Sequence, residues 1–244
     1  MNGLEAMNQG VQGISSMATR QLLRALGDAC ERAQGVPVRF ESVGGVDAAR
    51  RVQAGESFDL VVLAAEAIDE LAAAGHLVAP TCRPIATSSV AIAVRAGAVR
   101  PDVSSEAALR QAVLSAGRIG YSTGPSGSAL LKLFARWGVR ETLRDRLVQA
   151  QAGTPVAALL ASGRAELGFQ QFSELKDEDG IALLGPMPPG LEIVTTFVGA
   201  VGAGSSKVAA ARAALNFMAS PAGDEIRRHH GMARADPGSS HSHF

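Results

Sequence analysis

Short apolar segments alternate with amphipathic segments along most of the chain, and this alternation constrains the fold more than any other feature. Residues 58–63 read Phe-Asp-Leu-Val-Val-Leu, which is typical of a parallel strand covered on both faces. Leu22, Leu23, Leu26 and Cys30 recur at the spacing of one helix face. Repeated strand–helix units of this kind predict an α/β fold with parallel sheets and right-handed crossovers.

The number of these units indicates two lobes. The chain has 244 residues, which is long for one simple domain and short for two independent ones. We therefore expect two α/β lobes, with the apolar segments 90–94 and 195–201 as plausible crossing strands. The stretch 180–189 is rich in Gly and Pro and is predicted to form turns rather than a strand.

Composition excludes several classes of protein. Lys and Arg together number 23, as do Asp and Glu, and a neutral chain argues against a general nucleic-acid binder. No apolar run approaches the roughly 18 residues that span a bilayer. Residues 1–12 show no secretory signal, so a cytoplasmic location is expected if the sequence is complete. No phosphate-binding loop, dinucleotide fingerprint or nucleophile elbow occurs, and no cofactor or metal is expected.

Four segments that precede predicted helices share one character: they are small, neutral and rich in hydrogen-bond donors. The segments are Ser15-Ser16-Met17, Gly44-Gly45, Tyr121-Ser122-Thr123-Gly124-Pro125-Ser126-Gly127-Ser128 and Thr154-Pro155-Val156. In parallel α/β sheets, ligands bind at the carboxyl ends of strands, where such segments lie.

These segments suit the binding of an anion. The first turn of a helix has unpaired N–H groups and a partial positive charge, and glycine lets the backbone approach a ligand closely. The alternative is ordinary helix capping, because Ser and Thr cap helices anywhere. Thr154 is predicted to cap a helix that has Pro155 at its first position. The third segment carries more small residues than a cap needs.

Five motifs occur in one order: Ile14–Thr19, Ser42–Gly45, Phe58–Val62, Tyr121–Gly127 and Leu167–Gln171. In these motifs the chain resembles the type II bacterial extracellular solute-binding proteins, specifically their molybdate-binding-protein-like branch, over about residues 12–232. The resemblance implies a periplasmic binding protein fold with residues 1–87 plus 197–244 in lobe one and 88–196 in lobe two. It also implies an oxyanion enclosed by hinge motion, a periplasmic location and an ABC-type permease as partner.

The resemblance carries ligand contacts over to particular residues. Ser16 matches an oxyanion-binding serine, whereas Gly44 and Gly45 fall where the family has another serine. Gln170 and Gln171 fall where molybdate binders carry a tyrosine, which points away from molybdate and toward a carboxylate or a neutral oxygen. The whole predicted ligand set is Ser15, Ser16, Met17, Arg20, Gly44, Gly45, Tyr121, Ser122, Gly124, Ser126, Gly127, Ser128, Thr154, Pro155, Val156, Gln170 and Gln171.

A sub-branch of the same family resembles aconitate isomerase, which implies a second hypothesis. An isomerase of an unsaturated polycarboxylate moves a proton along the acid and needs a general base. Arg20 is the candidate carboxylate clamp or a solvated surface arginine. Glu66 is the candidate base or a helix-start carboxylate, and Tyr121 is a proton relay or a half-buried strand tyrosine. Because no base stands out, binding is favoured over catalysis.

Overall fold

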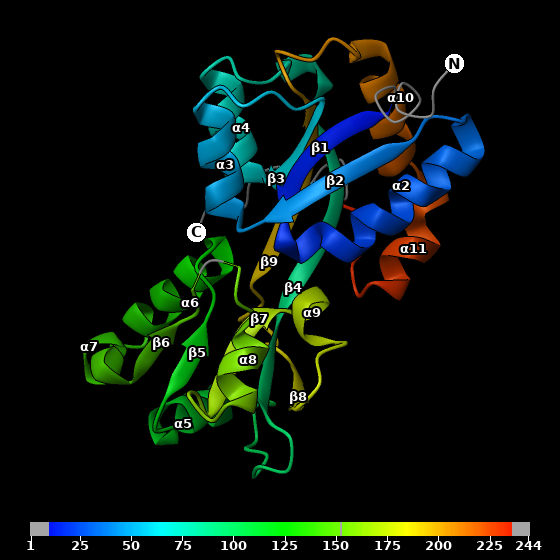
Figure 1. Cartoon of the computed structure of the whole chain (residues 1–244). Helices are drawn as coiled ribbons and strands as arrows, with labels where there is room; N and C mark the ends of the chain where they lie inside the picture. The colour runs from blue at the N-terminus through cyan, green and yellow to red at the C-terminus, as the bar shows by residue number, and fades with distance from the viewer. Residues whose placement is uncertain (1–9, 152, 236–244) are drawn as a thin grey trace. The chain divides into compact units, whose positions relative to one another are not determined.

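A computed structural model describes residues 10–151 and 153–235 (Figure 1). The chain divides into two compact units: unit 1 runs to Thr87 and resumes at Thr196, and unit 2 is Ser88–Thr195. The chain passes from one unit to the other within strand β4 (Arg83–Arg95) and again within β9 (Val194–Val201). Most of residues 1–12, in which the sequence shows no secretory signal, lies outside the described residues.

The sheet of unit 1 is built around β1 (Val11–Ser16). This strand runs parallel to β2 (Val38–Val43) on one side and to β3 (Leu60–Ala64) on the other, and β9 joins β3 in antiparallel pairing. Ser16 lies opposite Val43, and Ser15 lies opposite Val62. The carboxyl ends of the three parallel strands therefore meet at one edge of the sheet.

Helices cover both faces of this sheet. On one face α2 (Arg20–Gln34) and α10 (Val208–Ala219) pack on the sheet, and the predicted apolar face of α2 is buried there. On the other face lie α3 (Gly45–Gln53) and α4 (Ala65–Ala73). Short turns of 3-10 helix, η1 (Met17–Thr19), η2 (Ala79–Thr81) and η4 (Pro221–Gly223), and helix α11 (Asp224–His229) complete unit 1.

The sheet of unit 2 contains a second parallel group. Strand β5 (Ile119–Tyr121) runs parallel to β6 (Leu147–Gln149) and to β7 (Leu167–Gln171), and β7 pairs with β4 in antiparallel fashion. Helices α5 (Glu106–Ser115), α6 (Pro125–Arg136) and α7 (Arg140–Leu143) pack around Phe134, which meets Phe169 edge-on. Helices α8 (Val156–Ala161) and α9 (Phe172–Leu175) pack against the opposite side, and η3 spans Arg144–Arg146.

One predicted element of unit 2 is wrong. The stretch 180–189 contains a strand, β8 (Ile181–Pro186), which pairs with β4 in antiparallel register. Gly180 and Gly185 both have positive φ and interrupt the local pattern, yet Ile181 to Leu183 bring apolar side chains and backbone groups to the edge of β4. Pairing along that edge satisfies the backbone hydrogen bonds of these residues. These contacts between segments distant in the sequence outweigh the local preference of Gly and Pro for turns.

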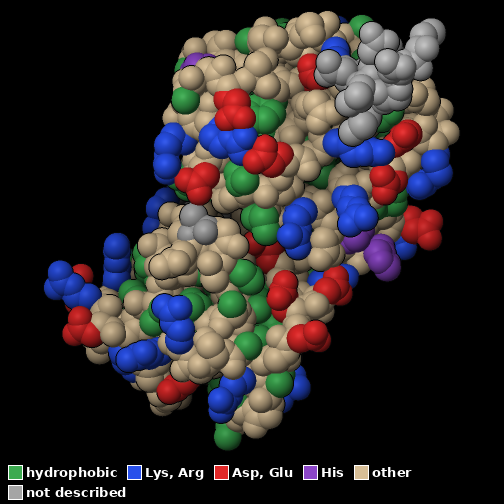
Figure 2. Space-filling model, in the orientation of Figure 1, with side chains coloured by type: hydrophobic (Ala, Val, Ile, Leu, Met, Phe, Trp, Pro, Cys, Tyr) green, Lys and Arg blue, Asp and Glu red, His purple; other side chains and the backbone are tan. Residues whose placement is uncertain are grey.

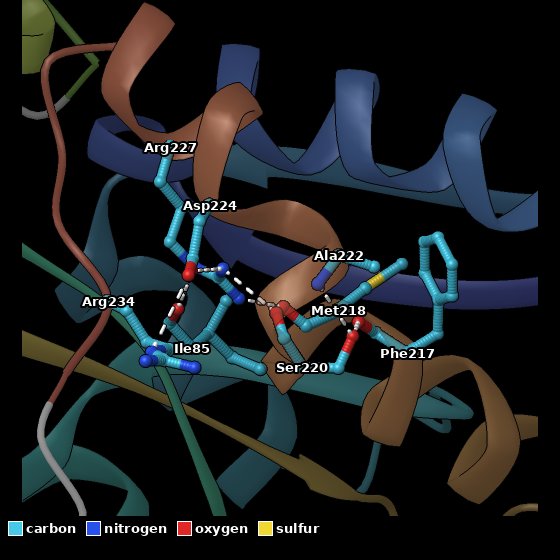
Figure 3. A network of polar contacts seen from close by, with 8 residues as sticks. All are labelled: Ile85, Phe217, Met218, Ser220, Ala222, Asp224, Arg227 and Arg234. Atoms are coloured by element: carbon cyan, nitrogen blue, oxygen red, sulfur yellow. Dashed lines mark hydrogen bonds and ion pairs between the residues drawn. The ribbon is translucent and has the colours of Figure 1, made fainter.

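A fully buried arginine ties the end of unit 1 to strand β4 (Figure 3). Arg227 in α11 donates from Nε to the Ile85 carbonyl at 2.7 Å, from Nη1 to the Ser220 carbonyl and the Asp224 carboxylate, and from Nη2 to the Met218 carbonyl. Burial lowers the pKa of the Arg227 guanidinium, and Asp224 opposes that shift. The side chain thus satisfies carbonyls at the end of α10 that the helix itself cannot pair.

Replacing this arginine is expected to be costly. Arg227→Ala leaves the Ile85 and Met218 carbonyls without their guanidinium donors, and the Ser220 carbonyl keeps only the Gly223 N–H. Breaking such a network costs about 3–5 kcal/mol of unfolding free energy. Denaturant unfolding followed by circular dichroism measures the loss. Arg228→Ala is the matched control because Arg228 is exposed on the same helix, and it is expected to change stability by less than about 0.5 kcal/mol. Equal losses for the two variants would contradict the role of the network.

A second arginine joins β2 to α3 at the surface. Arg51 donates from Nε to Glu56 at 2.6 Å and from Nη2 to Glu41 at 2.9 Å, and it lies over the Phe58 ring. The hydrogen bonds from Arg51 hold the pKa values of the Glu41 and Glu56 carboxyls below their usual range. This contact fixes the carboxyl end of α3 relative to β2.

This cluster predicts a pH dependence with a definite sign. Because the folded pKa values of Glu41 and Glu56 are lowered, their stabilising contribution is present above the unfolded pKa of about 4.3 and is lost as the pH falls further. Arg51→Ala is therefore expected to lower the Tm at pH 7, and the difference from wild type should shrink below pH 4. Arg24→Ala, at an exposed helical position, serves as control. A difference for Arg51→Ala that does not change with pH would refute this account.

Candidate functional site

The carboxyl edge of the parallel strands in unit 1 carries neutral groups. Ser16 ends β1, and its Oγ accepts from the Ala18 N–H at 3.3 Å at the start of η1. The next strand ends at Val43 and leads through Gly44 into α3, and β3 leads through Ala64 into α4. Neither Gly44 nor Ala64 caps its helix with a side chain. The first N–H groups of these two nine-residue helices are therefore not satisfied by a cap.

Gly45 lies directly beside Ser16. A Cβ placed on Gly45 would stand 3.7 Å from Ser16 Oγ, so any larger side chain there would extend over the hydroxyl. The sequence resemblance pointed to a serine on this loop, and the structure instead leaves open backbone next to Ser16. Met17 follows as the first residue of η1 and is half-buried.

Ser15 plays a different part from Ser16. It is fully buried, and its Oγ lies 2.8 Å from Ser42 Oγ on the neighbouring strand. Thr19, also buried, donates from Oγ1 to the Ser16 carbonyl at 2.9 Å. These bonds hold the backbone around Ser16 rather than offer donors of their own. Ser42 belongs to this arrangement because the parallel register sets it opposite Ser15.

The serine-rich loop of unit 2 forms the start of α6. Ser122 Oγ and Ser126 Oγ lie 2.9 Å apart, and Gly124 is the residue before the helix. A Cβ at Gly127 would stand 1.9 Å from the Ser122 carbonyl oxygen, so only glycine fits there. Ser128, the other serine of the loop, is exposed. The density of small residues thus has a packing reason in addition to any role in binding.

The start of α8 differs from the sequence expectation. The residue before the helix is Pro155, no side chain of that segment caps it, and the prediction that Thr154 caps this helix is wrong. Gln170, at the end of β7, accepts the Val156 N–H on its Oε1 at 2.7 Å. Gln170 is 3% exposed. A side chain fourteen positions away therefore supplies the hydrogen bond that Thr154 would have made.

Gln171 belongs to a further group of buried polar residues. Its Nε2 donates to Thr195 Oγ1 at 2.6 Å, and its Oε1 is one of two wholly buried side-chain atoms in the described residues that have no partner. Ser88, at the point where β4 enters unit 2, is also buried and lies 3.4 Å from Ser173, measured between the Oγ atoms. Thr195 gave no signal in the sequence because it lies 24 positions from Gln171 along the chain and meets it only in the folded protein.

The three residues proposed for catalysis lie on three different elements, α2, α4 and β5. Arg20 is exposed and lines a hollow of about 980 Å³ along α2 and β2, together with Arg24, Arg39 and His230. Ser16 and Gly45 are not among the residues that line it. Glu66 is exposed in the first turn of α4, and Tyr121 is half-buried at the end of β5.

Charge is scarce at the strand ends. Among the described residues, the only buried charged side chains are Asp59 and Arg227. Asp59 precedes β3, at the end opposite Ala64, and it accepts from the Gln12 N–H and Ser205 Oγ. On the face drawn in Figure 2, basic and acidic side chains are interspersed. No three His, Cys, Asp or Glu side chains of the described residues gather as a metal site would need.

The fold is that of the type II periplasmic binding proteins, as comparison with solved structures demonstrates. The periplasmic molybdate-binding protein of Azotobacter vinelandii superimposes with a TM-score of 0.76 over 93% of this chain and 100% of that one, at 16% identity. The sulfate-binding protein of Mycobacterium tuberculosis superimposes with a TM-score of 0.73 over 94% of this chain and 88% of that one, at 18% identity. The expected α/β fold is confirmed.

Residues 11–233 match the family of bacterial extracellular solute-binding proteins, and the chain belongs to that family. A relative of known activity, the aconitate isomerase of a Pseudomonas species, is 34% identical over 215 residues, which cover 85% of this chain and 81% of that protein. Within the described residues, no helix is both long enough and apolar enough to cross a membrane.

Proposed function

We propose that this chain binds a small anion, an oxyanion or a carboxylate, as the solute-binding protein of an ABC-type uptake system. The observation that carries the proposal is the set of neutral donors at the strand ends of unit 1: Ser16 beside Gly45, with two helix starts that no side chain caps. Backbone N–H groups and helix dipoles stabilise an anion without a formal cation. Family membership supports the same proposal, and so do the two structural relatives, which are a molybdate-binding and a sulfate-binding protein.

The partner and the location belong to this proposal. A solute-binding protein delivers its ligand to a membrane permease, and we propose that this chain does so in the periplasm. The family description, extracellular solute-binding protein, supports that location. The ligand contacts we propose in unit 1 are Ser16 and the Gly44–Gly45 backbone.

Calorimetric titration with molybdate, tungstate, sulfate and citrate tests the proposal. Ser16→Ala removes a hydroxyl at the strand ends and is expected to weaken binding of the preferred anion by about tenfold, the typical value of a hydrogen bond to a charged group. Ser220→Ala is the matched control, since Ser220 also starts a 3-10 helix and accepts an N–H, that of Ala222, at 3.3 Å. Both variants lose a cap, so they are expected to lose similar stability.

The affinity of Ser220→Ala should stay within about twofold of wild type. If the wild-type chain bound none of the four anions, the proposed function would fail. Equal affinities for Ser16→Ala and wild type would instead remove Ser16 from the site and leave the function standing.

A second candidate function is the isomerisation of a small unsaturated polycarboxylate. Its support is the 34% identity to an aconitate isomerase. In this reaction a base takes a proton from one carbon and a proton returns to another, so a positioned acid or base is required. Arg20 would clamp a carboxylate, and Glu66 and Tyr121 are the candidates for proton transfer. Both Arg20 and Glu66 are exposed, which suits a substrate-binding role less well than a buried position.

Incubation with trans-aconitate, followed by proton NMR for the appearance of cis-aconitate, tests this candidate. An enzyme of this kind should give turnover that Arg20→Ala reduces by about tenfold or more. Arg32→Ala is the control, because Arg32 is an exposed arginine of the same helix that does not line the hollow. Binding of the acid without turnover would leave the chain a solute-binding protein, and turnover unaffected by Arg20→Ala would exclude the clamp.

A further inference from the structure

Basic side chains are unevenly distributed along unit 2. Residues 107–140 contain five basic residues and no acidic one, although the whole chain has 23 of each kind. Lys132 and Arg136 belong to α6, Arg140 begins α7, and Arg144 follows one helical turn later. All four are exposed, and Figure 2 shows basic side chains gathered over α6 and α7. We call these four residues the α6–α7 patch.

The patch faces solvent because the other side of the two helices is apolar. Leu133, Phe134 and Leu143 are buried in the core of unit 2. Gly138, with a φ of 69°, ends α6, and the Val139 N–H donates to the Phe134 carbonyl at 3.0 Å. The chain therefore passes into α7 directly after α6, and the basic side chains of the two helices follow one another at the surface.

The charges of the patch are scarcely neutralised within the chain. Lys132, Arg136 and Arg140 make no hydrogen bond or ion pair with the described residues. Arg144 reaches Glu141 only at 4.0 Å, and the two side chains are 79% and 86% exposed, so this pair contributes little. A cation suits the carboxyl end of α6, where Arg136 lies. Lys132 lies a turn earlier, and the two like charges repel.

We propose that the α6–α7 patch binds the phosphate headgroups of an anionic membrane surface. Specific docking on a protein depends on a buried apolar anchor. The large exposed apolar side chains of the described residues all lie outside α6 and α7: Val46, Val99, Val194 and Val208. A lipid surface requires no such anchor, and each nearby Lys or Arg strengthens binding to it by about fivefold. The neutral chain argues against nucleic acid as the partner.

This proposal goes beyond the binding of a small anion, because it uses none of the ligand contacts proposed for unit 1. The patch would hold the protein at a membrane surface whether or not a ligand is bound. Attraction of this kind acts over about 8 Å at physiological salt, so only exposed charges contribute to it.

Cosedimentation with vesicles tests the proposal. The wild type is expected to bind vesicles of equal parts phosphatidylglycerol and phosphatidylcholine at about 0.05 M salt and to leave them at about 0.5 M. It should not bind vesicles of phosphatidylcholine alone. Trp137, the single tryptophan of the chain, lies between Arg136 and Arg140, so energy transfer from Trp137 to a dansyl-labelled lipid reports whether this part of the protein meets the surface.

Two double variants locate the binding surface. Lys132→Gln with Arg136→Gln, and Arg140→Gln with Arg144→Gln, should each weaken binding to the anionic vesicles by about tenfold or more. Arg32→Gln with Arg228→Gln is the matched control, because it removes the same charge from exposed helical positions of unit 1, and its affinity should stay within about twofold of wild type. Thermal unfolding checks that each variant is folded.

Several results would overturn the proposal. One is a wild type that binds the two kinds of vesicle equally or binds neither. Another is an affinity that both folded patch variants retain, or that the control loses to the same extent. Tighter binding of duplex DNA than of the anionic vesicles at the same salt would assign the patch to nucleic acid instead. None of these results bears on the calorimetric test of the proposed function.

Discussion

The parallel pairing of β1 with β2 and β3 is the constraint on which the site in unit 1 depends. It sets Ser16 opposite Val43 and therefore beside the Gly44–Gly45 turn. Side chains alternate between the two faces of a strand, so a slip of one residue would exchange the places of Ser15 and Ser16. The buried Ser15–Ser42 hydroxyl pair opposes such a slip because it forms in one register only.

Neutral donors give this site a different energetic character from a cluster of cations. A buried unpaired cation carries a large desolvation cost, whereas backbone N–H groups and hydroxyls are fixed dipoles that need no counterion in the empty protein. The two buried charges in the described residues, Asp59 and Arg227, are instead satisfied within the scaffold.

Elements that are determined by local sequence patterns were predicted correctly. Elements and caps that depend on residues distant in the sequence were not. The apolar period of α2 and the continuous apolar run of β3 predicted both elements, and the family resemblance predicted the fold. Strand β8 was missed because its glycines are typical of turns. Its hydrogen bonds to β4, which is distant in the sequence, stabilise it as a strand. The cap of α8 was assigned to Thr154 because the sequence gives no sign that Gln170, fourteen residues later, takes the Val156 N–H.

Amide NMR during titration with an anion tests the central claim most directly. The probe is citrate or sulfate, whichever binds more tightly. If neutral strand-end donors hold the ligand, the backbone signals of residues 16–18 and of residues 45–46 shift together with one Kd. Signals around the hollow of Arg20 and Arg24 then stay in place. Shifts confined to that hollow, with Ser16 and Gly45 unmoved, would contradict the account.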